Sequence, residues 1–420
     1  MTPPMKDRGH IWIGELPSTW KLRRFKDAGR FQTGRDHKEL KAGNVPVFGS
    51  SCEPFAMVDR PLCRRKAIAI GRKGTVDRPF VIQPGFWAVD TCMFHTVQRK
   101  DYSLEYLGYW SNIVPWQEIA TQTALPSLTQ TDANNVIVGY PPLDEQRRIA
   151  SWLDLQTHRI DKRRELLGKK RELLRDLRIN LILEVLASGL RGHEKSPTGL
   201  CDLPELPLGW TASHAKRLLR YVTSGSRGWA KYYADEGDLF LRIGNLTRET
   251  IDLDLSDVKY VALPSKAAEG KRTRLREGDM LVSITADLGS IAVAPKLNKP
   301  AYVNQHIALC RAKDSVHPRW LGYAMCSPQS KRQMMDFGYG GTKIQLSLDD
   351  VRNVWLAVPP LDEQREMAAF LDARLDKIAR QIALIDQLDD LLQQQRQAII
   401  HEAVTGKIDL SAYDPPAEMA

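Results

Sequence analysis

A seven-residue motif occurs twice in this chain, and the duplication limits the folds that the chain can adopt. Pro-Pro-Leu-Asp-Glu-Gln-Arg begins at Pro141 and again at Pro359, 218 positions later. After each copy an apolar residue recurs every seven positions, and the two series keep the same offset. The series are Leu153, Ile160, Leu167, Leu174 and Leu181, then Leu371, Ile378, Ile385, Leu392 and Ile399. A sustained seven-residue period predicts one long helix per copy, with an apolar stripe along one side.

The ends of both helices are marked in the sequence. The double prolines cannot continue a preceding helix, and Asp144 and Asp362 place negative charge in the first turn, at the positive end of the helix dipole. Gly189 and Gly406 stand where the patterns stop, as C-terminal caps do. Each helix is therefore expected to span about 45 residues, or roughly 65–70 Å. Intermediate positions are expected to add to the stripes: Ile149, Leu177 and Val185 in the first helix, and Leu375, Ile382 and Leu388 in the second.

The charges of the two helices differ. Residues 144–188 carry 11 Lys/Arg against 8 Asp/Glu, whereas residues 362–405 carry 5 against 9. Opposite net charge favours packing of the first helix on the second, and two separate homodimer zippers are the alternative. The basic triplets Lys162–Arg164 and Lys169–Arg171 share one face of the first helix. We interpret that face as the solvated side of the helix pair, with contact to DNA or an acidic partner as the second interpretation.

The segments before the two helices are related more loosely. Leu16-Pro17-Ser18-Thr19-Trp20 matches Leu206-Pro207-Leu208-Gly209-Trp210, and Leu107-Gly108-Tyr109 matches Leu321-Gly322-Tyr323. The offset grows from 190 at the tryptophans to 218 at the prolines, so the second segment holds about 28 more residues. Apolar runs at 67–70 and 280–284 predict buried strands there. Both segments are therefore expected to be mixed α and β.

The predicted order is globular domain, long helix, globular domain, long helix. The expected boundaries are 1–140 for the first domain, 141–190 for the first helix, 191–205 for a linker, 206–358 for the second domain, 359–407 for the second helix and 408–420 for a tail.

Composition narrows the class of partner. The chain has 420 residues with a net charge of +9, which suggests a polyanionic partner such as nucleic acid. No stretch approaches the roughly 20 continuous apolar residues that a membrane span needs. The six cysteines are scattered without a C-x-x-C pair, so we expect reduced thiols in a cytoplasmic protein and no metal site.

The duplicated Pro-Pro-Leu-Asp-Glu-Gln-Arg motifs, the Leu-Pro-x-x-Trp segments and the helix ends at Gly189 and Gly406 together resemble the specificity subunit of type I restriction–modification systems. The resemblance covers essentially the whole chain. It implies an α+β fold in which two mixed α/β target-recognition domains are separated by two long antiparallel helices. These helices form a coiled-coil spacer, and the whole subunit has a pseudo-twofold internal repeat.

The resemblance also implies partners. The chain is expected to bind double-stranded DNA at two short blocks a fixed distance apart, and to dock two methyltransferase subunits and, through them, restriction subunits. It is expected to be non-catalytic and to bind no cofactor, because S-adenosylmethionine, ATP and magnesium belong to those partners. Because the two domains diverge in sequence, each is expected to read a different half of the target.

Candidate DNA contacts are polar side chains around the predicted strands. Arginine pairs with guanine edges and asparagine or glutamine with adenine, whereas lysine and small hydroxyls hold phosphates. The candidates in the first domain are Arg64, Arg65, Lys66, Arg72, Lys73, Gln122, Thr123 and Ser127. Those in the second domain are Arg272, Arg274, Arg276, Asn304, Gln305, Thr342 and Lys343.

Catalytic signatures are missing from the sequence. It contains no G-x-x-x-x-G-K-[ST] phosphate loop, no H-E-x-x-H pair and no Asn/Asp-Pro-Pro-aromatic run of adenine methyltransferases. Two alternatives stay open at this point: a stand-alone DNA-binding regulator that dimerises through its helices, and a nuclease with an unrecognised site. Neither alternative needs two different reading domains in one chain.

Overall fold

The computed structural model describes residues 4–9, 12–121, 126–192, 194–225, 227–264, 268–337 and 345–415. The chain divides into two compact units. Unit 1 holds Met1–Lys169 and Ile385–Ala420, and unit 2 holds Lys170–Leu384. Each long helix therefore contributes one part to each unit.

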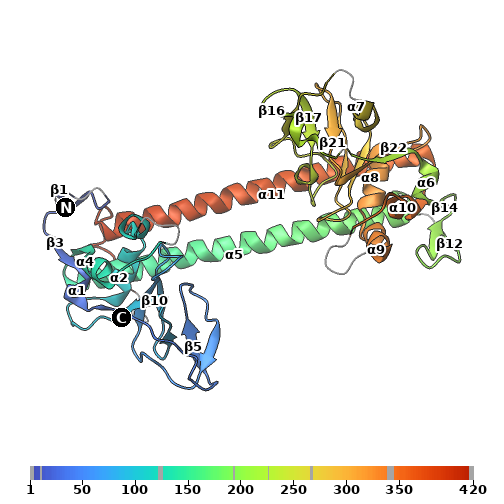
Figure 1. Cartoon of the computed structure of the whole chain (residues 1–420). Helices are drawn as coiled ribbons and strands as arrows, with labels where there is room; N and C mark the ends of the chain where they lie inside the picture. The colour runs from blue at the N-terminus through green and yellow to red at the C-terminus, as the bar shows by residue number, and fades with distance from the viewer. Residues whose placement is uncertain are drawn as a thin grey trace. The chain divides into compact units, whose positions relative to one another are not determined.

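Unit 1 contains a mixed domain ahead of the first long helix (Figure 1). Its strands are β1 Met5–Asp7, β2 Glu15–Pro17, β3 Lys21–Arg24, β4 Phe31–Thr33, β5 Val45–Phe48, β6 Ala56–Val58, β7 Ala67–Gly71, β8 Phe80–Ile82, β9 Trp87–Ala88, β10 Cys92–His95 and β11 Ile137–Tyr140. Its short helices are α1 Phe25–Ala28, α2 Leu104–Ser111, α3 Trp116–Ile119 and α4 Gln130–Asn135.

The centre of this domain is a four-stranded antiparallel sheet in the order β4-β10-β7-β8. All residues of β7 are buried, as expected for the continuous apolar run Ala67–Ile70. A second sheet has three strands in the order β6-β5-β9 and contains one parallel pair, β5 with β9. Strand β3 pairs with β11, so the chain that leaves the domain passes next to the chain that enters it.

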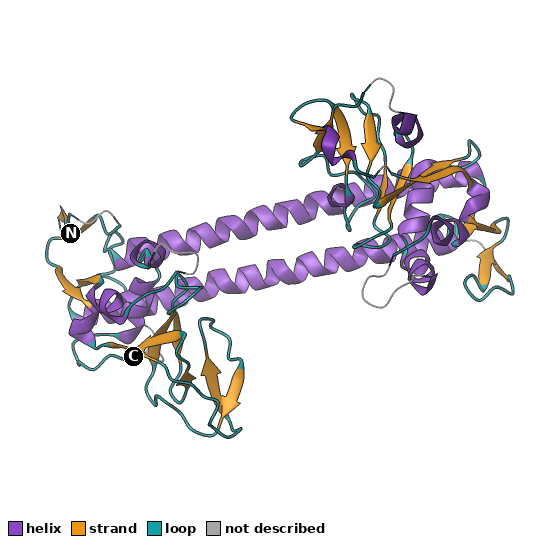
Figure 2. Ribbon diagram, in the orientation of Figure 1, coloured by secondary structure: helices purple, strands orange, loops and turns teal. Residues whose placement is uncertain are grey.

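Unit 2 holds the second mixed domain (Figure 2). Its strands are β12 Lys195–Pro197, β13 Glu205–Pro207, β14 Thr211–His214, β15 Leu219–Ser224, β16 Tyr233–Ala234, β17 Asp238–Leu241, β18 Lys259–Val261, β19 Met280–Ser283, β20 Ile291–Val293, β21 Ala301–Val303, β22 Ile307–Ala312 and β23 Trp355–Val358. Its helices are α6 Ala215–Leu218, η1 Trp229–Tyr232, η2 Ile243–Asn245, α7 Ala268–Thr273, α8 Pro318–Cys326, α9 Pro328–Phe337 and α10 Leu348–Asn353.

Strand order in unit 2 follows that of unit 1. The main sheet runs β15-β22-β19-β20, and the smaller sheet, β16-β18-β17-β21, again contains one parallel pair, β17 with β21. Strand β14 pairs with β23 as β3 pairs with β11. The additional residues of the second domain lie between β15 and β19, where η1, β16, η2 and α7 have no counterpart in unit 1.

The two long helices match the predicted lengths. Helix α5 spans Leu143–Ser188, 46 residues, and helix α11 spans Leu361–Val404, 44 residues. Gly189 and Gly406 follow them with φ of 68° and 72°, the left-handed backbone that glycine adopts without strain. The glycines therefore end both helices, as the sequence predicted.

Within unit 1 the start of α5 packs against the end of α11. Leu153 shares a buried cluster with Ile400 and Val404. Farther along, Arg164 donates to the Asp389 carboxylate at 2.7 Å, and Arg396 donates to Asp161 at 3.0 Å. Partners in α11 have lower numbers as α5 advances, so the two segments run antiparallel. In unit 2, Leu371 near the start of α11 shares a cluster with Ile182 and Val185 near the end of α5.

The seven-residue stripes supply the buried sides of these helices. Buried members are Leu153, Ile160, Leu371, Ile378, Ile385 and Leu392, and half-buried members are Leu167, Leu174, Leu181 and Ile399. Leu177 and Leu388 were expected in the stripes but are 52% and 45% exposed. That expectation was wrong because two paired helices cover only a narrow seam and leave its flanks in solvent.

A buried glutamine ties each long helix to its domain. In unit 1 the Gln146 Oε1 accepts the backbone N–H of Ser103 at 2.9 Å, and its Nε2 donates to the Pro141 carbonyl at 2.9 Å. Gln364 repeats the arrangement in unit 2: it accepts from the His317 N–H at 2.8 Å and donates to the Pro359 carbonyl at 2.9 Å. Ser103 and His317 are the N-caps of α2 and α8, so each glutamine joins two helix starts.

Two further pairs repeat at the same places. The indole N–H of Trp20 donates to Glu145 at 3.2 Å, and that of Trp210 donates to Glu363 at 3.0 Å. These bonds explain why Leu-Pro-x-x-Trp and the duplicated motif occur together, since the tryptophan of the first binds the glutamate of the second.

The expected linker at 191–205 is partly ordered. Strand β12 pairs with β13 in register from Lys195↔Pro207 to Pro197↔Glu205. The Gly, Ser and Pro residues that marked this linker occur in short hairpins with tight turns as well as in loops.

We predict that Gln146→Ala destabilises unit 1. The variant leaves the buried Ser103 N–H without an acceptor, which costs about 1–3 kcal/mol and lowers Tm by several degrees. Thermal unfolding followed by circular dichroism measures the effect. Gln394→Ala on the exposed side of α11 is the matched control and should leave Tm unchanged; equal Tm values for the two variants would contradict the prediction.

Candidate nucleic-acid interface

A polar groove of about 500 Å³ lies over the main sheet of unit 1. Its lining includes three arginines, two glutamines and two threonines and contains no carboxylate: Gln32, Thr33, Arg35, Leu62, Cys63, Arg64, Arg65, Phe94, Thr96 and Gln98. Strands β4 and β10 supply its floor, and the segment before β7 supplies Arg64 and Arg65. The groove is therefore positively charged and rich in paired hydrogen-bond donors.

The predicted basic cluster before β7 divides in the structure. Arg64 and Arg65 are exposed and line the groove, and among the described residues they form no ion pair. Lys66 instead binds Glu105 on α2, with Nζ 2.9 Å from Oε1. Burial alone would raise the pKa of Glu105, but the bond from Lys66 holds this pKa below its ordinary value. Lys66 is therefore paired within the domain and does not line the groove. Arg35, which was not among the candidates from the sequence, lines it instead.

A second group of predicted residues meets at the end of β7. The Arg72 N–H donates to the Thr91 carbonyl at 2.7 Å, and the Leu128 N–H donates to the Arg72 carbonyl at 2.9 Å. Lys73 and Ser127 form an antiparallel bridge. Three segments therefore converge at one corner of the sheet, where the Lys73 side chain is exposed.

Unit 2 has the same corner with different side chains. The Ile284 N–H donates to the His306 carbonyl at 3.0 Å, the Leu346 N–H donates to the Ile284 carbonyl at 2.9 Å, and Thr285 bridges to Gln345. Asn304 and Gln305 lie in the β21–β22 turn that reaches this corner. The strand order places this turn where unit 1 has its β9–β10 turn, so both domains build the corner from equivalent segments.

The side chains of the β21–β22 turn bond to one another. The His306 ring Nδ1 lies 2.9 Å from the Thr285 Oγ1, and the Gln305 Nε2 lies 3.2 Å from the His306 Nε2. The Asn304 Oδ1 accepts the His306 N–H at 3.2 Å. These bonds orient three amide and imidazole groups that are each half-buried.

Two glycines hold the corners together and were missed in the sequence. A Cβ on Gly34 would lie 2.2 Å from the Ala88 carbonyl oxygen, and one on Gly225 would lie 2.0 Å from that of Asn304. Each glycine follows the first strand of its main sheet, where the turn carrying the corner residues crosses the backbone. The sequence shows a glycine after Thr33 and another after Ser224, but only the fold shows that a backbone carbonyl lies against each of them.

The arginines before β19 do not act as one cluster. The Arg272 guanidinium donates to the Thr223 hydroxyl, and its carbonyl accepts from the Tyr221 hydroxyl at 3.0 Å. The Arg276 N–H donates to the Asp279 carboxylate at 2.8 Å, and Arg274 bridges to Tyr302 through its backbone. All three side chains have exposed surface, and Arg272 is the member directed at the main sheet.

An ion pair supports this edge of the sheet. Arg311 binds Asp279, which is 1% exposed, with two 2.6 Å bonds. The hydrogen bond to the carboxylate raises the pKa of Arg311, so this guanidinium stays charged and serves the fold.

Some sequence predictions lie elsewhere. Gln122, Thr123, Thr342 and Lys343 fall outside the described residues. In the basic triplets of α5, Arg164 binds Asp389 and the Gln393 side chain, which assigns it to helix packing. Among the described residues no group of three His, Cys, Asp or Glu side chains could hold a metal ion. In the same part of the chain, no helix combines the length and apolarity of a membrane span.

The sequence of this chain is similar to those of specificity subunits of type I restriction enzymes. Residues 241–390 match the family described as type I restriction modification DNA specificity domain. The MjaVIII specificity subunit of Methanocaldococcus jannaschii is 21% identical over 298 residues, 68% of this chain and 65% of the relative. The EcoBI specificity subunit of Escherichia coli is 22% identical over 308 residues, 68% of this chain and 62% of the relative. The alignments thus span less than two thirds of these relatives' lengths.

A solved structure that concerns complex assembly and conformational transition of the type I R-M system has a similar fold. It has a TM-score of 0.70 and 20% sequence identity, and the match covers 94% of this chain and 99% of that chain. The chain has an α+β fold that is similar to the fold of this structure. The resemblance to type I specificity subunits, predicted from the duplicated motif, is confirmed.

We predict that Gly225→Ala disrupts the corner of unit 2. The added methyl group overlaps two backbone carbonyls, which should cost about 1–3 kcal/mol and lower Tm. Gly244→Ala is the matched control, because nothing lies within 4 Å of a Cβ at that position. Unfolding of both variants is measured by tryptophan fluorescence; a Gly225→Ala protein with the Tm of the control would contradict the overlap.

Proposed function

We propose that this chain is the non-catalytic DNA-recognition subunit of a type I restriction–modification complex. Its two domains would read the two halves of a bipartite target. The observation that carries the proposal is that both domains build the same corner from equivalent segments but place different side chains there. A shared frame with different reading groups suits two different DNA sequences.

The chemistry of the first domain supports base reading. Arg64, Arg65 and Arg35 supply guanidinium groups free of intramolecular ion pairs among the described residues, and guanidinium binds guanine or phosphate with two hydrogen bonds. Gln32 and Gln98 add amide groups that can pair with adenine. Lys73 and Arg72 at the corner are better suited to phosphates.

The long helices would form the spacer between the reading domains. Helices of 46 and 44 residues extend roughly 65–70 Å, and antiparallel packing within each unit supports a coiled-coil pair. Such a stiff pair would fix the number of unspecified base pairs between the two DNA blocks. An antiparallel pair with a domain at each end would give the chain pseudo-twofold symmetry and two docking sites related by the internal repeat.

A second repeated stripe supports docking of two copies of a partner. Leu166 and Leu173 on α5 are 57% and 68% exposed, and Leu384 and Leu391 on α11 are 63% and 60% exposed. The second pair follows the first by the same 218 positions as the duplicated motif. Exposed leucines seven residues apart on one helix offer apolar surface that a partner can bury, and methyltransferase subunits are the partner that this proposal assigns to it. Restriction subunits would join through them, and S-adenosylmethionine, ATP and magnesium would bind these partners.

The experiment that tests the proposal is a selection of random DNA fragments by the chain co-purified with its methyltransferase partner. Two short blocks at one fixed spacing are expected, and a chimera with residues 206–358 replaced should change only one block. A single contiguous motif, or none from an intact complex, would move the assignment to a DNA-binding regulator that dimerises through its helices.

We further predict that Arg64→Ala/Arg65→Ala weakens DNA binding of the complex. If both arginines contact phosphates, their loss should reduce the slope of log K against log salt concentration by about two. If they contact bases, their loss should relax the sequence specificity in one block. Fluorescence anisotropy at several salt concentrations distinguishes the two. Arg374→Ala/Arg380→Ala on α11 is the control, and unchanged binding by the first double variant would exclude the groove.

A further inference from the structure

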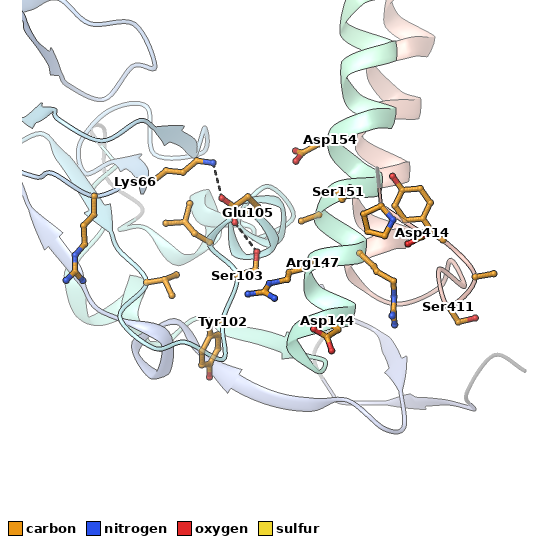
Figure 3. Close-up of a pocket in the computed structure, with 18 residues that line it drawn as sticks. Lys66, Tyr102, Ser103, Glu105, Asp144, Arg147, Ser151, Asp154, Ser411 and Asp414 are labelled. Atoms are coloured by element: carbon orange, nitrogen blue, oxygen red, sulfur yellow. Dashed lines mark hydrogen bonds and ion pairs between the residues drawn. The ribbon is translucent and has the colours of Figure 1, made fainter. Parts of the chain in front are cut away.

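A cleft of about 1030 Å³ lies in unit 1 between the domain, the start of α5 and the segment after α11 (Figure 3). Tyr102–Glu105 at the start of α2 form one wall, and the α5 face from Asp144 to Asp154 forms the opposite one. Residues 411–415 complete the lining. The cleft shares only Arg65 with the polar groove described above, so it is a separate feature.

The internal repeat shows what occupies the equivalent place in unit 2. There the Tyr323 hydroxyl donates to Asp372 at 2.5 Å, and the Arg319 guanidinium binds the same carboxylate at 2.8 and 2.9 Å. Arg319 also reaches Asp252 at 2.6 Å. A guanidinium from the chain itself therefore covers Asp372.

In unit 1 the tyrosine and the carboxylate are kept but the guanidinium is not. The Tyr109 hydroxyl donates to the Asp154 Oδ1 at 2.6 Å. Glu105 stands at the position of Arg319, four residues before the tyrosine in both domains, and turns to Lys66. Among the described residues the Asp154 carboxylate accepts no hydrogen bond besides the one from Tyr109.

A buried hydroxyl faces the same cleft. Ser151 is 7% exposed, and its Oγ has no hydrogen-bond partner among the described residues. The side chain lines the cleft on the same helix as Asp154 (Figure 3), and unit 2 has Ala369 at this position. The Arg148 Nε and the Tyr413 hydroxyl, also in the lining, have no hydrogen-bond partner in the described part of the chain either. A buried polar group without a partner is costly, so such a concentration indicates a site that a ligand completes.

We propose that this cleft binds an arginine side chain of a partner protein. The guanidinium would pair with Asp154 and donate to Ser151, as Arg319 does to Asp372 within unit 2. Arg147 is exposed and extends from α5 toward the loop that holds Ser103 (Figure 3), so a carboxylate beside the incoming arginine would be matched too. The occupant is therefore a segment in which arginine neighbours an acidic residue.

The inference rests on the proposed function, because the partner is the methyltransferase subunit. It adds that the two docking sites are not equivalent: the site at unit 1 takes an arginine from the partner, whereas the site at unit 2 has its own.

The test is substitution of the position that differs between the repeats. Glu105→Arg would supply the guanidinium from within the chain, as Arg319 does, and close the cleft to the partner. Asp154→Asn would remove the carboxylate but keep an acceptor for Tyr109. Glu105→Gln is the matched control, because it removes the charge of Glu105 in the half-buried Lys66 pair without filling the cleft. Native mass spectrometry of the co-purified complex, with dilution series, measures how many methyltransferase subunits are bound.

Wild type and Glu105→Gln are expected to bind two methyltransferase subunits. On dilution, the Glu105→Arg and Asp154→Asn complexes should lose one methyltransferase subunit at complex concentrations at least tenfold higher than those at which the wild-type complex loses one. Their Tm should be unchanged. Two subunits held at wild-type affinity by both variants would overturn the inference and leave the proposed function standing. A wild-type chain that binds no methyltransferase overturns both, and a lowered Tm with normal stoichiometry assigns these residues to folding and also overturns it.

Discussion

The buried glutamine at the start of each long helix is the interaction on which the rest of the molecule depends. An amide has both a donor and an acceptor, so Gln146 and Gln364 can bond a domain backbone N–H and a motif carbonyl at once. An ionised carboxylate has no donor and could form only one of the two bonds. With the helix start fixed to the N-cap of α2 or α8, the direction of a helix of more than 40 residues is set by a few atoms.

This fixed frame leaves the outer parts of each domain free to differ. The tryptophan–glutamate and tyrosine–aspartate pairs are kept in both units, close to the helix. The groups at the sheet corner differ, with Lys73 and Ser127 in unit 1 against Thr285 and Gln345 in unit 2. Scaffold and reading surface are therefore separated within each domain.

The sequence predicted what depends on local periodicity. It located both long helices, their glycine ends and the strands β7 and β19, because a helix stripe or a buried strand is visible in consecutive residues. It could not show that Gln146 meets Ser103, 43 positions earlier, or that Gly34 lies under a carbonyl of β9. Such contacts are set by the fold. For the same reason Lys66 was grouped with Arg64 and Arg65, although a glutamate on α2 binds it.

The make-up of unit 1 has a consequence for synthesis of the chain. Its core joins Trp20 and Tyr106 to Ile400, Ala403 and Val404, and the Tyr106 hydroxyl donates to the Val404 carbonyl at 3.3 Å. Unit 2 is continuous from residue 170 to 384. During translation the second domain can therefore complete its core while the first still waits for the last turns of α11. Emergence from the ribosome thus reverses the usual order, in which the domain made first is the one that folds first.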